Sequence, residues 1–386
     1  MKTPPLMDMM RELVAIPSVS SVAPQYDQGN LDLIQHMLPW LDDLGFEVEV
    51  QRLDGAPAKA NLIATLKPDH PDGSGGLILS GHTDTVPYDT DRWDSDPFEL
   101  VERDGALHGL GISDMKGFLA MAMEASRQFH PSHLRAPITL IATADEESSM
   151  SGGRALHKLE LPKGAVCIIG EPTSLRPVRM HKGILMESLR LIGRSGHSSD
   201  PSLGNSALEG MQKSMAALLA WRAEMQARYR NGAFSVPVPT LNLGRIQGGD
   251  NPNRICPQCE LTFDMRFLPG MPLEALRAGF RERVETILSN SGLGIEWTAL
   301  FGGVEAFETA ADAPIVRACE EFCGHPAQAV AFATEGPFYA SLGIDTVILG
   351  PGDIGCAHQP NEHLPLDRIT PTLDILTRLI ERFCGR

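Results

Sequence analysis

The sequence predicts an α/β protein of two domains, in which a mixed, largely parallel sheet flanked by helices carries an inserted α+β sandwich. Short apolar runs at Leu77 to Ser80, Ile138 to Ala142 and Val166 to Gly170 are separated by helical segments, as is typical of buried parallel strands. Polar residues follow each run directly, and open α/β sheets place their ligands at the carboxyl ends of such strands. The 386 residues also exceed what one hydrophobic core usually serves.

The remaining elements of the first part of the chain follow from the spacing of apolar residues. Apolar positions at helical spacing predict helices, and Gly45 is a typical stop signal after the second of them. A helix that begins just after Asp114 would leave this carboxylate in a tight loop at the sheet edge. The helices are expected over 6–15, 29–44 and 117–129, and two further strands over 46–50 and 61–66.

From about Lys182 the pattern changes to alternating strands and long helices, which is typical of an α+β sandwich. We assign residues 182–292 to the inserted domain, and residues 1–181 and 293–386 to the two parts of the sheet domain. Strands are expected at 184–192, 241–246, 260–267 and 294–299, and helices at 207–228 and 273–288. The chain then returns to the first pattern, with a helix expected at 314–323 and a strand at 346–349.

The polar residues that follow the predicted strands form one set of potential metal ligands. His82, Asp114, Glu146, Glu147 and Glu171 offer imidazole and carboxylate groups and no thiolate. Such a set suits Zn, Co or Mn in an open catalytic site better than a closed structural zinc site. Four carboxylates at one sheet edge would repel one another and would be expensive to desolvate without a cation. The sequence therefore predicts a dinuclear metal centre.

Charge and cysteine content limit the possible partners and the compartment. A formal net charge of -16 argues against nucleic acid or an anionic membrane as partner. The first twenty residues contain no apolar segment of signal-peptide length, and no run approaches transmembrane length. Seven scattered Cys favour reduced thiols in the cytoplasm. Cys256 and Cys259 have the spacing of half a zinc site or a redox pair, but no second pair follows, so we interpret the spacing as coincidence.

Six motifs in order resemble the M20 family of dinuclear metallo-deacylases and peptidases, over nearly the whole chain. The resemblance implies a zinc-peptidase type of α/β domain with an inserted ferredoxin-like domain that acts in dimerisation and as a lid. The motifs are Gly81-His82-Thr83-Asp84-Thr85-Val86-Pro87, Gly111-Ile112-Ser113-Asp114-Met115-Lys116-Gly117, Asp145-Glu146-Glu147, Gly170-Glu171-Pro172-Thr173, Arg194-Ser195-Gly196-His197-Ser198-Ser199, and the segment around His358.

The resemblance implies a ligand set for two divalent ions, Zn or Co, with Mn as a further possibility. His82 and Glu171 would hold one of the two metals, and Glu147 and His358 would hold the other. Asp114 would bridge both, which requires that both oxygens of its carboxylate be exposed on a rigid loop. The turn ahead of the predicted helix is a reasonable device for that.

Two acidic residues next to the ligands are implied to act in catalysis. Glu146 would be the general base, which takes a proton from the attacking water and passes it to the leaving amine. Asp84 would accept the second imidazole N–H of His82 and so fix the orientation and tautomer of the ring. The alternatives are a solvated strand-end residue for Glu146 and a loop carboxylate that caps a nearby turn for Asp84.

The inserted domain is implied to supply groups that contact the substrate. In the family, the residue matching His197 reaches the active site of the opposite subunit and donates to the tetrahedral oxyanion, which requires a homodimer. Its alternative is a surface loop histidine. Arg254 offers a bidentate fork for the carboxylate of an amino acid. We also expect Asn242 to bind the substrate, and Glu335 to lie near its cationic side chain.

The resemblance implies hydrolysis of the amide of an N-acyl-L-amino acid. Within the family, five short segments are most similar to the branch that removes the acetyl group of N2-acetyl-L-ornithine. They are Thr240 to Gly244, Gly248 to Asp250, Asn253 to Cys256, Thr334-Glu335 and Leu349 to Gly352. Desuccinylase, aminoacylase and dipeptidase activities share the metal ligands and remain alternatives. A binding protein that lost catalysis is disfavoured because every expected ligand and Glu146 are present.

Overall fold

The computed structural model describes residues 2–72 and 75–386. Contacts within this part of the chain divide it into two compact units. The first, here called the sheet unit, comprises the chain up to Arg179 together with Thr309–Gln328 and Thr334–Arg386. The second, here called the inserted unit, comprises Met180–Glu308 and Ala329–Ala333. Residues 293–308, which the sequence assigns to the returning sheet domain, belong to the inserted unit because strand β12 pairs with strand β9.

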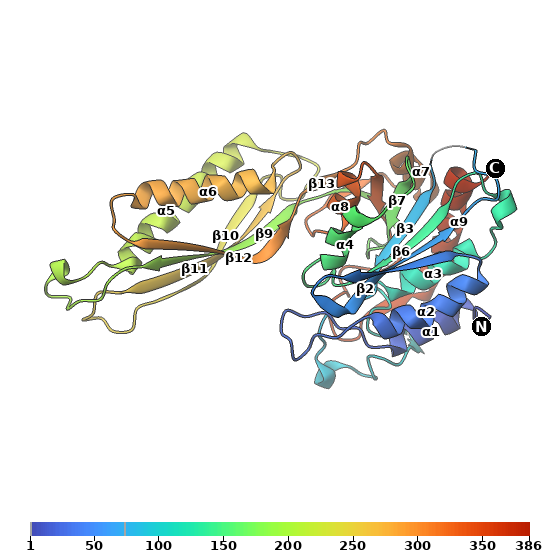
Figure 1. Cartoon of the computed structure of the whole chain (residues 1–386), viewed down its shortest axis with the longest axis horizontal. Coiled ribbons are helices and arrows are strands. Elements are labelled where there is room, and N and C mark those ends of the chain that lie inside the picture. The colour runs from blue at the N-terminus through green and yellow to red at the C-terminus, as the bar shows by residue number, and fades with distance from the viewer. Residues whose placement is uncertain (1, 73–74) are drawn as a thin grey trace. The chain divides into compact units, whose positions relative to one another are not determined.

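The sheet unit is built on a mixed β-sheet with the strand order β1-β2-β6-β3-β7-β15 (Figure 1). Strands β6, β3, β7 and β15 run parallel, whereas β1 and β2 pair antiparallel with each other and β2 pairs antiparallel with β6. The strands are β1 (Glu47–Leu53), β2 (Ala56–Leu66), β3 (Leu77–His82), β6 (Ile138–Thr143), β7 (Val166–Ile169) and β15 (Asp345–Ile348). The sheet continues to β8 (Val178–His181), whose Val178 pairs with Ile348.

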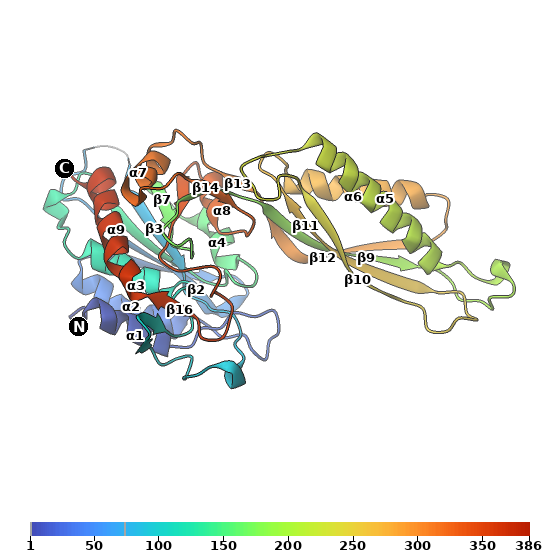
Figure 2. The ribbon, with the colours of Figure 1, turned by 180° about the vertical axis from the view of Figure 1, so that it is seen from behind.

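Helices cover both faces of this sheet. In Figure 2, α3 and α9 lie on the face turned toward the viewer, and in Figure 1, α4 and α8 lie on the opposite face. The helices of the sheet unit are α1 (Leu6–Ala15), α2 (Leu31–Asp43), α3 (Lys116–Ser126), α4 (Ser151–Ala155), α7 (Pro314–Cys323), α8 (Gly336–Ser341) and α9 (Ile369–Cys384).

The larger core of the sheet unit lies between one face of the sheet and helices α1, α2, α3, α7 and α9. Leu77 and Leu79 of β3 belong to this core. Because side chains alternate along a strand, Ser80 and His82 point to the opposite face of the sheet from Leu77 and Leu79. The hydroxyl of Ser80 hydrogen-bonds to that of Tyr339 in α8 at 2.7 Å. The end of β3 therefore presents His82 on the side of the sheet away from the larger core.

The predicted meeting of polar strand ends is confirmed. The three apolar runs of the sequence form β3, β6 and β7, and β3 runs parallel to both of the others. The register places His82 opposite Thr143 and Ser80 opposite Ile169. The residues that follow these strands therefore emerge at one edge of the sheet.

Several parts of the sheet unit are not among the predicted elements, and two of them help to build the fold around the site. A small antiparallel sheet has the order β16-β5-β4, with β4 (Val101–Arg103), β5 (Ala106–His108) and β16 (His363–Pro365). Strands of three residues are too short to show a period in the sequence. The second part is α9, which packs against α3 and α7 and buries Ile375, Leu376, Leu379 and Ile380 at helical spacing.

The inserted unit consists of a four-stranded antiparallel sheet covered by two helices on one face (Figure 1). The strand order is β10-β11-β9-β12, and the chain passes through β9, α5, β10, β11, α6 and β12. Its core contains Phe263, Phe280 and Trp297 in mutual ring contact. Ser206 caps α5 by accepting the N–H of Glu209. The elements are β9 (Gly183–Ile192), α5 (Ala207–Arg228), β10 (Thr240–Gly248), β11 (Gln258–Phe267), α6 (Leu273–Leu288) and β12 (Gly294–Val304), followed by β13 (Phe307–Glu308) and β14 (Gln328–Val330).

Among the residues that the structure describes, no helix combines the length and the apolar character that crossing a membrane requires.

Candidate metal centre

His82 ends β3 and is 1% exposed. Its ring nitrogen Nδ1 lies 2.9 Å from the backbone carbonyl oxygen of Asp84, and its Nε2 lies 3.0 Å from Oδ1 of Asp114. Because a carbonyl oxygen only accepts, Nδ1 carries the proton of the neutral ring. The lone pair of Nε2 then faces a carboxylate oxygen, so a cation or a second proton is needed between the two atoms.

Asp114 directs its two oxygens at two different histidines. Oδ1 faces His82, and Oδ2 lies 3.3 Å from Nε2 of His358. The same Nε2 lies 2.9 Å from Oε1 of Glu147. His358 comes from the segment after β15, where its backbone has a φ of 59°, and its side chain is half exposed. The sheet unit therefore brings together one bridging carboxylate and one histidine on each side of it.

Glu146 and Glu147 follow β6, and the carboxylate of Asp84 holds the backbone of both. Oδ1 of Asp84 accepts the N–H of Glu146 at 3.2 Å, and Oδ2 accepts the N–H of Glu147 at 3.0 Å. The predicted bond between the Asp84 carboxylate and the imidazole N–H of His82 is not the one formed, since these groups are 3.8 Å apart and the ring bonds to the backbone carbonyl. The carboxylate of Asp84 accepts the backbone N–H groups of Glu146 and Glu147, and the backbone carbonyl of Asp84 accepts the ring N–H of His82 instead.

Glu171 follows β7 and is 6% exposed. The residue before it, Gly170, packs closely against Phe118, because a Cβ at Gly170 would lie 2.0 Å from the ring of Phe118. Oε1 of Glu171 has no hydrogen-bond partner among the described residues. One ligand atom each from His82, Glu146 and Glu171 lies within 4.8 Å of the others, and the same holds for His82, Asp114 and Glu147.

The pKa values of the cluster show how strongly its charges interact. Burial and the nearby Glu171 raise the pKa of Glu146 well above its usual value, and burial together with Asp114 does the same for Glu171. Burial opposes protonation of His82, but the contact with Asp114 outweighs it and raises the pKa of the ring. Hydrogen bonds to Asp114 and Glu147 raise the pKa of His358 to about 10. The pKa of each of these four groups is therefore shifted toward the protonated form.

These residues fit a pair of divalent cations. The donors are two imidazole nitrogens and carboxylate oxygens, the ligand types that zinc and similar ions accept in open sites. The unpartnered buried oxygen of Glu171 and the two imidazole nitrogens that face Asp114 are the groups that a cation would satisfy. Mutual repulsion of the buried carboxylates would fall in the same step.

Glu335 is not at a surface that a substrate side chain can contact. It precedes α8 and is 1% exposed, and its Oε2 accepts the hydroxyl of Thr143 at 2.8 Å. Burial raises the pKa of Glu335 to about 7. The expectation from the sequence rested on the resemblance and on the charge of Glu335, and neither reveals that the side chain is buried and bonded to Thr143 of β6.

Two further acidic residues that the sequence analysis gave no role support the ligand loops. Glu362 accepts three backbone N–H groups of the loop that carries Asp114. Asp145 accepts the hydroxyls of Ser20 and Ser149 and pairs with the buried ammonium group of Lys59. The motifs contain both acids, but no pattern in the sequence connects them with their partners.

The inserted unit brings three of its expected site residues to its surface. His197 and Arg254 are exposed and face each other in an antiparallel bridge between two loops. The hydroxyl of Ser199 hydrogen-bonds to Nδ1 of His197 at 2.8 Å, and Arg254 forms an ion pair with Asp250. Asn242 is exposed on β10 and is not part of this bridge.

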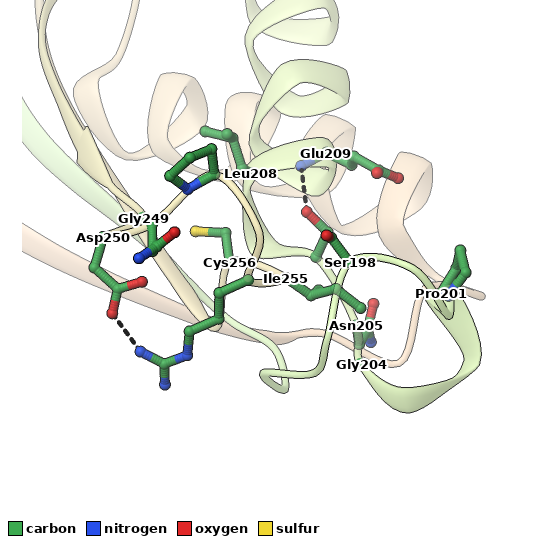
Figure 3. A pocket seen from close by; sticks show the side chains of 14 residues that line it. Ser198, Pro201, Gly204, Asn205, Leu208, Glu209, Gly249, Asp250, Ile255 and Cys256 are labelled. Atoms are coloured by element: carbon green, nitrogen blue, oxygen red, sulfur yellow. Dashed lines mark hydrogen bonds and ion pairs between the residues drawn. The ribbon is translucent and has the colours of Figure 1, made fainter.

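A cavity of about 610 Å³ lies in the inserted unit between these loops and the start of α5 (Figure 3). Its lining includes Ser198, Asn205, Glu209, Asp250, Arg254 and Cys256. Cys256 and Cys259 are both buried free thiols.

Comparison with known proteins matches residues 78–382 to the model of peptidase family M20/M25/M40. The chain is 43% identical to an acetylornithine deacetylase of Pasteurella multocida over 383 residues, which are 99% of each chain. It is 44% identical to an acetylornithine deacetylase of Edwardsiella ictaluri, again over 99% of both chains.

Solved structures with the same fold share much less sequence. Aminopeptidase PepT of Bacillus cereus superimposes with a TM-score of 0.74 at 22% identity, and the match covers 97% of each chain. The YXEP protein of Bacillus subtilis, described as a dinuclear metal-binding peptidase of the M20 family, matches with a TM-score of 0.67 at 14% identity, over 97% of this chain and 96% of that one.

Proposed function

The chain belongs to peptidase family M20/M25/M40, and on this premise we propose that it hydrolyses N2-acetyl-L-ornithine to L-ornithine and acetate. It is a hydrolase, and its full-length relatives at 43% and 44% identity are acetylornithine deacetylases. The biological role would be the release of ornithine for arginine biosynthesis.

The orientation of Asp114 is the observation that carries the chemical part of the proposal. One carboxylate oxygen faces His82 and the other faces His358. A carboxylate that has a separate nitrogen ligand on each side can bridge two ions, which is the arrangement used by dinuclear hydrolases. Glu171 would complete the ligands on the side of His82, and Glu147 those on the side of His358.

Two divalent ions held by these residues, Zn or Co with Mn as a further possibility, would polarise the amide carbonyl and lower the pKa of a water molecule. Glu146 supplies the proton transfer. Burial and the nearby Glu171 raise its pKa above the usual value. The backbone N–H of Glu146 donates to the carboxylate of Asp84, and this bond holds Glu146 in place. Glu146 would take the proton from water and pass it on to the leaving amine.

The inserted unit would bind and orient the rest of the substrate. His197 would donate a hydrogen bond to the oxyanion of the opposite subunit's site in a homodimer. Arg254 would exchange its present ion pair with Asp250 for the substrate carboxylate, and Asn242 would contribute a polar contact. The buried position of Glu335 favours a contribution through its electric field over a direct contact with the cationic side chain. This ferredoxin-like unit would then serve as lid and dimerisation domain.

The free thiols agree with a reducing compartment. All seven Cys are unpaired within the described chain, and five of them are buried. We infer a cytoplasmic location from this pattern.

The experiment that tests the function compares substrates with the metal-reconstituted protein. We expect N2-acetyl-L-ornithine to give a higher kcat/KM than N-succinyl-diaminopimelate, N-acetyl-L-methionine or a dipeptide, and the activity to disappear on chelation. N-acetyl-L-norvaline is the matched control substrate, because it lacks only the side-chain amine of the ornithine compound. A preference for one of the other compounds would leave the hydrolase assignment intact and overturn the substrate. Absence of turnover on all of them with metal bound would favour a binding protein.

A further inference from the structure

Glu362 is a buried acid whose side chain bonds mainly to backbone. It is 2% exposed, and its carboxylate accepts three N–H groups from one loop. Oε2 accepts the N–H of Gly111 at 3.0 Å, and Oε1 accepts those of Ser113 at 2.8 Å and Asp114 at 3.0 Å. An anion in a cup of successive backbone N–H groups is a stable and directional arrangement.

The loop held by Glu362 is the one that carries the bridging carboxylate. The φ of Gly111 is 81°, a backbone conformation that favours glycine, and the peptide bond after Asp114 is cis. Glu362 itself lies four residues after His358, on the other segment that faces Asp114. One side chain therefore ties together two ligand-bearing segments that are about 250 residues apart in the sequence.

Two neighbouring contacts reinforce this tie. The hydroxyl of Ser113 accepts the N–H of Asp353, and the N–H of Gly109 donates to the backbone carbonyl of Glu362. Burial and the nearby Asp114 raise the pKa of Glu362 to about 8, whereas the three backbone N–H groups favour its ionised form. The carboxyl group therefore has three backbone donors, and no cationic side chain bonds to it in the described structure.

We propose that Glu362 is a positioning residue of the metal centre, which fixes the loop from Gly111 to Asp114 so that the two oxygens of Asp114 point to His82 and His358. The inference rests on the proposed function only for the identity of the site as a metal centre, and it does not depend on the substrate. Glu362 acts through the backbone and does not touch the reacting atoms.

The test is the metal affinity of Glu362→Gln, measured by competition with a chromophoric chelator for Zn²⁺ and by the absorption spectrum of the Co²⁺ form. The amide of Gln retains one acceptor but turns an NH₂ group toward a backbone N–H, so one of the three bonds is lost. We expect the affinity for at least one ion to fall by about 10–100-fold, as for other partners of metal ligands. The Co²⁺ spectrum should change, and Glu362→Asp, which keeps both acceptors, should recover part of the affinity.

Glu305→Gln is the matched control. Glu305 also accepts a backbone N–H with its carboxylate, that of Leu273 at 3.1 Å, but it lies in the inserted unit, which contains none of the proposed metal ligands. This variant should lose some thermal stability and keep the metal affinity and the Co²⁺ spectrum of the wild type. An equal loss of affinity in both variants would mean that general destabilisation explains the effect, and it would overturn the proposal.

A measurement on the wild type keeps the proposal testable if Glu362→Gln does not fold. In the metal-free protein, hydrogen exchange of the amides of Gly111, Ser113 and Asp114 should already be slow, since Glu362 holds them without an ion. Fast exchange of these three amides, or wild-type metal affinity in a folded Glu362→Gln, would overturn the inference. Tight metal binding that depends on Glu362, without hydrolysis of any acyl amino acid, would instead overturn only the proposed function.

Discussion

The two units present their polar residues in opposite ways. In the sheet unit, Asp114, Glu146 and Glu171 are buried, and their surroundings shift the pKa of each strongly. In the inserted unit, His197 and Arg254 are exposed and already have partners in Ser199 and Asp250. The first cluster is assembled without a ligand, whereas the second would have to give up existing contacts to bind a substrate as proposed.

This difference has a basis in free energy. Burying carboxylates together costs several kcal/mol for each charge that is not matched by a cation or a hydrogen bond. An exposed ion pair such as that of Arg254 and Asp250 contributes at most about 1 kcal/mol, because water screens it. Changes in the sheet unit should therefore alter chemistry and metal binding strongly, and changes in the inserted unit should affect turnover with little effect on folding.

The largest effect is expected for Glu146→Gln, which removes the base and keeps the side-chain volume. Because no other group is proposed to move the proton, kcat should fall by about 10²–10⁴-fold. Steady-state kinetics and elemental analysis of the same sample should show this loss with the metal content retained. Glu160→Gln, a change at an exposed acid of the same unit, serves as control and should leave kcat unchanged. Turnover close to that of the wild type in Glu146→Gln would show that Glu146 is only a strand-end residue.

A smaller effect is expected for His197→Ala. Loss of one donor to an oxyanion lowers kcat by about 10²–10³-fold, and the exposed position of His197 should leave the melting temperature unchanged. His157→Ala, a change at an exposed histidine of the sheet unit, is the control and should have neither effect.

Mixing the two inactive proteins tests whether His197 serves the opposite subunit. If His197→Ala and Glu146→Gln subunits exchange, half of the dimers are mixed and each has one complete site, so about a quarter of the wild-type activity should return. Failure to recover activity after proven subunit exchange would contradict the shared site.

The smallest effect is expected in the pH dependence of stability, through Glu335. Its pKa is about 7 in the folded protein, against an ordinary value of 4.5, so the folded state holds the proton more tightly. Stability is therefore lost as the pH rises from about 4.5 to 7, by a free energy on the order of 3 kcal/mol at about 1.4 kcal/mol per pKa unit. Relative to the wild type, metal-free Glu335→Gln should gain stability over this range in urea unfolding. A constant difference between pH 5 and pH 8 would contradict the raised pKa.

The residues that meet in the candidate metal centre can be predicted from the sequence because each one follows an apolar run or lies in a short motif. The pattern of the run identifies a buried strand, and the parallel order of the strands brings their ends together, as β3, β6 and β7 do. The meeting of His82 and Asp114 follows from this topology and from the helix that begins at Lys116.

The hydrogen bonds that hold the ligands are not predictable in the same way. Asp84 and Glu362 bond to backbone N–H groups, which every residue except proline carries, so no residue type marks their partners. For this reason Asp84 is predicted to bond to the ring of His82, and Glu362 receives no role. Glu335 shows a related limit, because its charge suggests contact with a cationic substrate while its burial depends on the packing of α8.

The order of the segments along the chain has a consequence for synthesis. The inserted unit consists almost wholly of the continuous stretch Met180–Glu308, so it can fold as soon as that stretch leaves the ribosome. The sheet unit needs strand β15 from the later part of the chain, between β7 and β8. His358 and Glu362 are synthesised later still, so the insert can fold before the residues proposed to complete the metal centre have been added to the chain.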